Sequence, residues 1–555
     1  MTTPPRLLSA VAACCLVLAS LGTAPGEAAP ATSTPATHLT WNSVQGPLTE
    51  DAEGGMPGTT RNPPSPICST TGSPVVNVNT DCEGTAPRNE TTIAVNPVNP
   101  RNLIGGVNDF QLSVSPGGTV HETGYSRAHV TFDGGATWTT SPIPDEDRYS
   151  STGDPAIAFD AAGTAYYATL GLTSSQGKFC CTNPDVVVSH SSNGGQAWSA
   201  PAVVAAGSGI MTSAGIFNDK EYIAAWGTGN AIVTWTRFNL GLRGTFTSSP
   251  IFDSVTHDGG NTWSEPQQIS GSAPFCVGAF STPANTCNQN QFSVPVVAAD
   301  GSIHVAFENL SNFATFRDQY LVVKVSPSTG ALVAGPNKVA DLVDGFTDYP
   351  IAFYGRQTLQ DSEFRVNSAG NLVADPTNAS HLAVVWSDMR NSTLPAPSDP
   401  YSAVTNADVV LSQSNDGGAT WSAPVAINEP NDQFFPWAVY GADGLLRVGY
   451  FDRSYDPGNH KYGYTLATET APGALSFTTH QVSTTLSDPT QGERWFSRTT
   501  VNAAFPHPTT FMGDYSGIAD LPSGATAALW TDMRNTVCFT TRCGSGQDAF
   551  YGTSG

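Results

Sequence analysis

The chain has 555 residues and a formal net charge of −23, and only 12% of its residues are charged. Nucleic acids and anionic membranes bind clustered lysine and arginine side chains, so this charge balance excludes both kinds of partner. A neutral ligand, or one recognised by a few local groups, fits the composition better.

Residues 1–28 read as a secretory signal. One arginine precedes an apolar run from Leu7 to about Leu21, and the small residues Gly26 and Ala28 mark a cleavage site near Ala28. Cys14 also fits a lipoprotein cleavage site, but the apolar run continues past it. No later stretch approaches the roughly 20 apolar residues of a membrane span. We therefore expect a secreted protein.

The cysteines point to disulfides. Ten are present, and removing Cys14 and Cys15 with the signal leaves eight, an even number in an oxidising compartment. Three pairs are close enough to staple single loops: Cys68/Cys82, Cys276/Cys287 and Cys538/Cys543. The adjacent Cys180 and Cys181 either form a strained bridge or pair elsewhere. No cysteine or histidine spacing resembles a zinc site, and we expect neither a metal nor a cofactor.

Beyond a Pro/Gly/Ser-rich lead-in over residues 29–86, short β-type runs alternate with turn residues and no long segment has helical periodicity. The first unit has four such runs, "TTIAVNP", "NLIGGVND", "RAHVTFD" and "TWTTSPI". Corresponding units begin at Pro155, Glu221, Ser293, Glu363, Pro436 and Ser516. The chain is therefore predicted to be all-β.

Repeated four-stranded units are typical of a β-propeller, in which each blade buries its faces against its neighbours. The repeat count predicts a single propeller of seven blades over residues 87–555, with six as the alternative. The last unit lacks a fourth strand. The N-terminal "HLTWNSV" or "PVVNVN" could supply it and close the ring.

One polar turn recurs four times, at residues 131–139, 191–199, 256–264 and 414–422. These Gly-rich turns fall between the third and fourth strands of a blade. We expect the aspartates to accept backbone N–H bonds, the glycines to supply positive φ and the tryptophans to pack between blades: Asp133, Asp258, Asp416, Trp138, Trp198, Trp263 and Trp421. This is a folding device, on the face opposite any site.

Charged residues gather on that other face, at the starts of first strands and the ends of second strands. They are Glu90, Asp154, Asp219, Asp432 and Asp514, with Asp109, Arg237, Glu308, Asp388, Arg390, Asp452, Arg453, Asp532 and Arg534. Converging acidic and cationic groups predict a polar binding or catalytic cleft near the axis. The alternative is that the Asp-Met-Arg and Asp-Arg pairs are salt bridges between blades, which we favour for Asp532 and Arg534.

The four turns resemble the Asp-box, S-x-D-x-G-x-T-W, of the sialidase superfamily, with Asn193 and Ala197 as departures. "DYSGIADLPSGATAALWTD" is similar to the sialidase segment that carries the nucleophilic tyrosine, which implies that role for Tyr515. "SEFRVNSAGNLVADPTNASHLAVVWSDMRN" looks like the strand pair that begins with a glutamate and ends in an arginine. The resemblance implies that Glu363 activates the tyrosine and that Arg390 belongs to an arginine triad.

Other roles follow from the same resemblance. Arg453 would be the second arginine of the triad, and Asp109 or, less favoured, Asp154 the acid/base. Glu90 stands where the family has its first arginine, with Arg88 two residues earlier. We include Arg88, Arg237 and Asp154 among the candidate substrate-binding residues.

The sequence as a whole predicts a secreted, monomeric, sialidase-like glycoside hydrolase that acts on an acidic glycan with a tyrosine/glutamate nucleophile. A tyrosine suits an anionic sugar because a neutral phenol is not repelled by the substrate carboxylate. Two alternatives stay open: a non-catalytic propeller that binds glycans or proteins, and a polysaccharide lyase or neutral-glycan hydrolase on the same scaffold.

Overall fold

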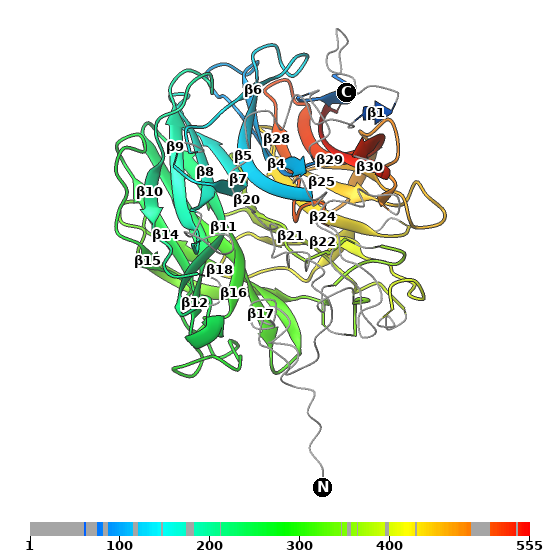
Figure 1. Ribbon diagram of the computed structural model, residues 1–555. Coiled ribbons are helices and arrows are strands. Elements are labelled where there is room, and N and C mark those ends of the chain that lie inside the picture. Colours follow the sequence, from blue (N-terminus) through cyan, green and yellow to red (C-terminus); the bar gives the residue numbers. More distant parts are fainter. Residues whose placement is uncertain are drawn as a thin grey trace, which may run out of the picture.

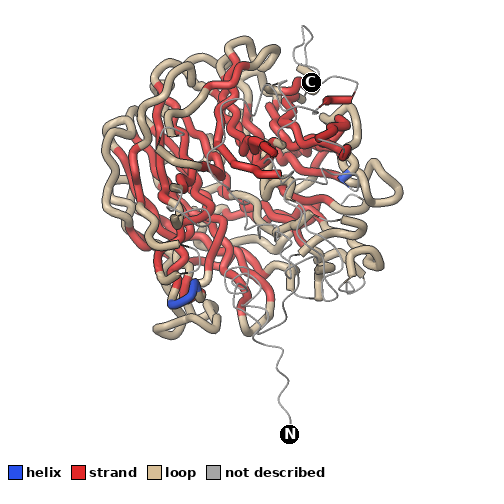
Figure 2. Tube along the Cα trace, in the orientation of Figure 1, coloured by secondary structure: helices blue, strands red, loops and turns tan. Residues whose placement is uncertain are grey.

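The computed structural model describes residues 60–62, 75–81, 87–114, 120–145, 148–173, 182–210, 213–345, 347–351, 357–362, 364–393, 399–427, 430–489, 511–539 and 542–554. Within these ranges the chain consists of β-strands and connecting loops, with short helical turns such as η2 (Leu242–Gly244) (Figure 2). Several predictions fall outside them: residues 1–28, "HLTWNSV", Cys68, Cys82, Cys180, Cys181 and Glu363. No helix in the described ranges is both long and apolar enough to span a bilayer.

The strands form seven antiparallel sheets, which follow one another around a ring (Figure 1). The first blade consists of β3 (Arg88–Val95), β4 (Leu103–Val114), β5 (Val120–Thr131) and β6 (Thr139–Ser141). The second consists of β7 (Ser151–Phe159), β8 (Ala165–Leu172), β9 (Asp185–Ser191) and β10 (Ala202–Ala205). The third consists of β11 (Gly215–Trp226), β12 (Asn230–Leu240), β13 (Phe246–Ser248), β14 (Ile251–Thr256) and β15 (Gln267–Gln268).

The next three blades have the same meander of four strands. The fourth blade consists of β16 (Asn290–Val297), β17 (Ile303–Asn312), β18 (Arg317–Val325) and β19 (Leu332–Asp341). The fifth consists of β20 (Leu372–Ala374), β21 (Leu382–Asp388), β22 (Asp408–Ser414) and β23 (Val425–Ile427). The sixth consists of β24 (Gln433–Tyr440), β25 (Leu446–Asp452), β26 (Gly463–Glu469) and β27 (Phe477–Gln481). The fifth blade differs from the prediction, because its first strand is β20 and not the segment 363–370.

The seventh blade closes the ring with the N-terminal part of the chain. It consists of β28 (Gly517–Asp520), β29 (Thr526–Phe539), β30 (Arg542–Thr553) and β2 (Val78–Asn79), which pairs antiparallel with β30. "PVVNVN" is therefore the closing segment. The short β1 (Thr60–Asn62) pairs with the far end of β29, a contact that the sequence pattern did not predict. In Figure 1 the red strands of this blade lie beside the blue first blade.

The first strand of each blade is the innermost one. β3, β7, β11, β16, β20, β24 and β28 each contact the first strands of both neighbouring blades, so together they form a closed inner ring. The loops that lead into the first strands and out of the second strands therefore meet at one end of the axis. This end is where the sequence pattern placed the charged residues.

The core is divided among the blade interfaces. Six apolar clusters of the described residues each join two neighbouring blades, as where Leu103 and Val107 pack against Leu529 and Tyr551 of the last blade. The remaining cluster joins the sixth and seventh blades and also reaches Val294 of the fourth. Both faces of a sheet are covered, so central strands such as β8 and β25 are buried along their whole length. A blade cannot bury both faces alone, which makes the ring the folding unit.

The Gly-rich turns have the predicted structural role. In the turn at residues 414–422, Asp416 Oδ1 accepts the Thr420 N–H at 2.9 Å and Oδ2 accepts the Thr420 hydroxyl at 2.6 Å. Gly417 and Gly418 have φ of 69° and 83°. The Gly417 N–H donates to the Ser380 carbonyl, in the loop between the first and second strands. The turns thus lie on the face opposite the charged residues, as predicted.

Their tryptophans pack between blades, also as predicted. The ring of Trp138 lies 5.0 Å from that of Tyr551, which belongs to the neighbouring last blade. The other three, Trp198, Trp263 and Trp421, pack against three further interface clusters. A ring wedged between sheets helps to fix the angle between blades.

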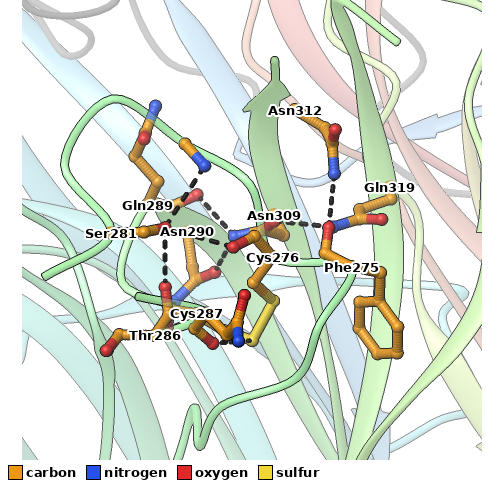
Figure 3. The surroundings of a disulfide bond; sticks show 12 residues. Phe275, Cys276, Ser281, Thr286, Cys287, Gln289, Asn290, Asn309, Asn312 and Gln319 are labelled. Atoms are coloured by element: carbon orange, nitrogen blue, oxygen red, sulfur yellow. Dashed lines mark hydrogen bonds between the residues drawn. A yellow bond between two sulfur atoms is a disulfide. The ribbon is translucent and has the colours of Figure 1, made fainter. Parts of the chain in front are cut away.

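One predicted disulfide is formed. Cys276 and Cys287 are bridged in the loop that leads from β15 into β16, on the face opposite the Gly-rich turns (Figure 3). The amide of Asn290 donates to the Cys287 carbonyl at 2.7 Å and fastens the loop to the start of β16. The backbone register also places Cys538 opposite Cys543. The side chains of these two cysteines are not among those that the structure describes.

Candidate active site on the propeller axis

A β-bulge interrupts the first strand of five blades at the same place. The pairing with the second strand shifts there, and the bulged residue has a positive φ in each case: Glu90 (51°), Asp154 (58°), Lys220 (50°), Phe292 (56°) and Phe435 (49°). Such a backbone costs of order 1–3 kcal/mol in a residue other than glycine. Because first strands line the axis, the bulges bring side chains of different blades together there.

Lys220 is the centre of this convergence. Its Nζ lies 2.8 Å from Glu90 Oε1, 3.0 Å from Asp154 Oδ2 and 2.9 Å from Asp514 Oδ2. The four side chains are at most 4% exposed. With Arg365 they form what we call the axial cluster. Burial alone would lower the pKa of Lys220, but the three carboxylates raise it, so this ammonium group stays charged.

The pKa values of two carboxyl groups in the axial cluster are shifted in opposite directions. Arg365 Nε donates to Asp514 Oδ1 at 2.8 Å, and its second nitrogen binds Oδ2. Burial would raise the pKa of Asp514, but Arg365 and Lys220 hold it well below its usual range. Burial and the nearby Asp154 raise the pKa of Glu90 well above its usual value. These two neighbouring carboxyl groups therefore have pKa values that are shifted apart.

A cavity of about 30 Å³ lies against the axial cluster. Its lining comprises Lys220, Glu221, Tyr222, Phe292, Ser293, Val294, Ala369, Gly370, Trp437, Asp514 and Tyr515. That volume accommodates one or two water molecules. The partly exposed lining residues Tyr222, Phe292 and Tyr515 are aromatic. The ring of Trp437 lies 5.0 Å from that of Tyr222 and 6.2 Å from that of Tyr515, so flat apolar faces surround the polar floor.

Tyr515 connects the aromatic lining with the axial cluster. Its hydroxyl donates to the Pro155 carbonyl at 3.4 Å, and Lys220 Nζ lies 5.4 Å from its ring centroid. Burial raises the pKa of Tyr515 well above 10, and the charges of Glu90, Asp154 and Glu221 add to this. The phenol therefore keeps its proton unless a base removes it during reaction.

Asp219 and Glu221 flank Lys220 in the bulged strand. Asp219 Oδ2 accepts the side-chain amide of Gln291 at 2.8 Å. Burial, reinforced by Asp154, raises the pKa of Asp219 to about 7. Both carboxyl groups are at most 3% exposed. Because they add to the carboxyl groups of the axial cluster, acidic side chains outnumber cationic ones around the cavity.

Of the site residues predicted from sequence, Tyr515 and Asp154 belong to this region. Arg390 does not line the cavity. Its guanidinium group makes a bidentate ion pair with Asp388, in which Nε donates to Oδ1 at 2.8 Å and Nη2 donates to Oδ2 at 2.6 Å. The same group lies 5.2 Å from the centroid of the Trp386 ring. Arg534 repeats this arrangement with Asp532. Each of these two ion pairs joins residues of a single blade. The alternative prediction, that they are salt bridges between blades, is therefore wrong.

Arg453 is also bound by the protein. It is fully buried and donates to Asp432 Oδ2 at 3.3 Å and to the carbonyls of Asn459 and Gln360 at 2.9 and 3.1 Å. This pairing is with Asp432 and not with the adjacent Asp452.

The remaining predicted residues lie in the first and third blades. Asp109 contacts Arg88 at 3.4 Å and Arg127 at 2.8 Å. The guanidinium of Arg237 lies 4.9 Å from the Phe252 ring centroid, and burial lowers its pKa. None of the three predicted residues Asp109, Arg88 and Arg237 lines the cavity.

Sequence reasoning missed Lys220, Glu221 and Arg365. A signal was present for the first two, because "DKE" places three charged residues in succession directly before the apolar run "YIAAW". Arg365 had no such signal, since its segment was read as a strand. In the described ranges no group of three histidine, cysteine or acidic side chains is arranged to hold a metal ion.

No family model and no curated protein matches the sequence. Similar solved structures include a protein of unknown function from Dyadobacter fermentans, at 10% identity over 90% of this chain and 99% of that one, with a TM-score of 0.41. A Hadza microbial sialidase, Hz136, is 12% identical over 78% and 75% of the chains (TM-score 0.41). A variant of the NanB sialidase from Streptococcus pneumoniae is 9% identical over 89% and 98% (TM-score 0.42). Because propellers host many activities, function depends on the site itself.

Proposed function

We propose that this chain is a secreted glycoside hydrolase whose reacting centre is the axial cluster. One observation carries the proposal: a partly exposed tyrosine, Tyr515, meets buried carboxyl groups whose pKa values are shifted apart, upward for Glu90 and downward for Asp514. Strongly shifted pKa values in neighbouring carboxyl groups are typical of functional sites. Tyr222 and Trp437 add an aromatic wall to the cavity beside Tyr515.

In the proposed reaction Tyr515 is the nucleophile. Its raised pKa means that the phenol must lose its proton as its oxygen bonds to the anomeric carbon. Asp154 is the base we propose, because it precedes Pro155, whose carbonyl accepts the Tyr515 hydroxyl. The resemblance to sialidases assigns this role to Glu363 instead. Comparing Asp154→Asn with Glu363→Gln distinguishes the two bases.

The reacting sugar is proposed to be neutral. Recognition of a sugar carboxylate requires a guanidinium or ammonium group that can turn toward it. Arg390 is held by Asp388, Arg453 by Asp432, and Lys220 by three carboxylates.

Export is proposed for the same protein. The signal-like residues 1–28 and the Cys276–Cys287 disulfide both fit an oxidising compartment.

The test is a panel of nitrophenyl glycosides of neutral hexoses and pentoses, with nitrophenyl sialoside beside them. We expect the folded protein to hydrolyse a neutral glycoside and Tyr515→Phe to lose at least about 100-fold in kcat. The melting temperature of Tyr515→Phe should stay close to that of wild type, because the hydroxyl makes one long hydrogen bond. Hydrolysis of the sialoside alone would contradict the neutral substrate. Glycan binding without any hydrolysis would favour a binding module.

A further inference from the structure

Glu221 is a buried acid for which the fold offers no partner. Its side chain is 3% exposed, and neither carboxyl oxygen has a hydrogen-bond partner on another residue. It lines the same cavity as Tyr515. A polar group buried without a partner costs about 1–3 kcal/mol.

The bulge does not require a glutamate at this position. Glu221 follows the bulged residue Lys220, and the corresponding residues of the other four bulged strands are Thr91, Pro155, Ser293 and Pro436. Thr91 satisfies its hydroxyl within the fold, by donating to the Leu529 carbonyl at 2.6 Å. The third blade is therefore the one among these five that places an ionisable group there, next to the cavity.

We infer that Glu221 is a catalytic residue of the proposed glycosidase, the proton donor to the departing glycosidic oxygen. The inference rests on the proposed function. Burial raises the pKa of Glu221 well above its usual value, which favours the protonated form of the carboxyl group. A general acid must be protonated before the bond breaks.

The two half-reactions balance with the groups present. In the first, the Tyr515 oxygen bonds to the anomeric carbon and its proton passes to the base. The glycosidic C–O bond breaks, its electron pair stays on the leaving oxygen, and that oxygen takes the Glu221 proton. In the second, water bonds to the anomeric carbon and gives one proton to the Glu221 carboxylate. The Tyr515–carbon bond breaks, and Tyr515 recovers its proton from the base.

The test compares leaving groups. A dinitrophenolate departs without a proton, whereas a phenolate needs one, so loss of the acid affects phenyl glycosides selectively. We expect Glu221→Gln to lower kcat/KM for the phenyl glycoside by about 100-fold or more, and for the dinitrophenyl glycoside of the same sugar by less than about tenfold. Both sets of substrates cover the neutral sugars of the panel.

Asp253→Asn is the matched control. Asp253 is a buried carboxyl group of the same blade without hydrogen-bond partners, and it does not line the cavity. We expect this variant to keep wild-type activity on both substrates. Glu221→Ala provides a second readout, because azide can enter the vacated space and should yield a glycosyl azide.

If Glu221→Gln lowers kcat/KM equally for both leaving groups, or for neither, the proposed role of Glu221 is wrong. The glycosidase proposal would still stand if Tyr515→Phe loses activity as expected. A folded wild-type protein that hydrolyses no glycoside of the panel would overturn both.

Discussion

The ammonium group of Lys220 is the counter-charge for three buried carboxylates from three different blades. A buried ion pair is held together only if each charge has partners, because the cost of removing the ions from water is of the same order as their attraction. Asn108 completes the shell, since its amide donates to Glu90 Oε2 at 2.9 Å and its carbonyl accepts the Asp154 N–H at 2.9 Å. The cluster therefore fixes the relative positions of blades as well as the groups proposed to react.

Asp253 gives a prediction about stability and pH. Burial raises the pKa of this carboxyl group to about 8 in the folded chain, against about 3.9 when it is exposed to water. The folded state keeps a proton that the unfolded state releases, so this residue costs the wild type stability as pH rises from about 4 to about 8.

We expect Asp253→Asn to remove this loss. The unfolding free energy of the variant should rise relative to wild type by on the order of 4 kcal/mol between pH 4.5 and pH 7.5. Urea denaturation of both proteins at the two pH values measures it. A difference between the proteins that stays constant with pH would show that Asp253 does not hold the extra proton.

At this scale the sequence could identify residue types but not partners. Tyr515 and Asp154 could be placed near the axis because they stand at the starts of first strands. Arg390 and Arg453 occupy the analogous ends of second strands, yet their guanidinium groups turn to Asp388 and Asp432. Which acceptor an arginine reaches depends on side-chain torsions that spacing does not encode.

Among the elements, the Gly-rich turns could be predicted in detail and the bulges could not. Hydrogen bonds within a turn involve neighbours in sequence, so the pattern of aspartate, glycine and threonine determines them. The bulge at Lys220 depends on the register between β11 and β12, and no turn residue marks it. A shift of one residue changes which side chains face the axis, which is why Lys220 and Glu221 were missed.

The turn at residues 414–422 gives a prediction at the element scale. Asp416→Ala removes both hydrogen bonds from Thr420, and we expect it to lower the unfolding free energy by about 1 kcal/mol at neutral pH. Enzymatic activity should not change, because the turn lies on the face away from the axial cluster. The neighbouring exposed Asn415 provides the control, as Asn415→Ala.

The pH dependence of the same variant follows from the bonds to Thr420, which lower the pKa of Asp416 to about 2. A carboxyl group whose pKa is lowered by folding stabilises the fold above its unfolded pKa, and this contribution disappears as pH falls through the folded value. The difference between Asp416→Ala and wild type should therefore shrink between pH 4 and pH 2. Equal stability of the two proteins at pH 7 would contradict the role of the turn.

At the scale of the whole molecule, seven blades could be predicted because each repeats the same pattern of strands. The order of blades follows the chain, and their packing follows from sheets that are apolar on both faces. Most of the apolar core lies between neighbouring blades, so the first blade, for example, depends on both the last and the second. The contact that closes the ring is far from local, because β2 pairs with β30 and sets Val78 opposite Tyr551.

The closing strand gives the last prediction. The Thr80 N–H donates to the Ala549 carbonyl at 3.0 Å, and the Thr80 hydroxyl lies 2.6 Å from His129 Nδ1 in the first blade. Thr80→Pro removes this donor directly after β2, and we expect the unfolding free energy to fall by about 3 kcal/mol. Freeing β2 would also expose the edge of β30, so the variant should aggregate more readily on heating. Thr80→Val keeps the N–H and loses the hydroxyl, which contacts both His129 Nδ1 and, at 3.2 Å, the Ala549 carbonyl, so it separates the backbone hydrogen bond from the side-chain contacts. Urea denaturation with light scattering measures both effects, and a Thr80→Pro protein as stable as Thr80→Val would mean that the ring does not depend on this strand for its closure.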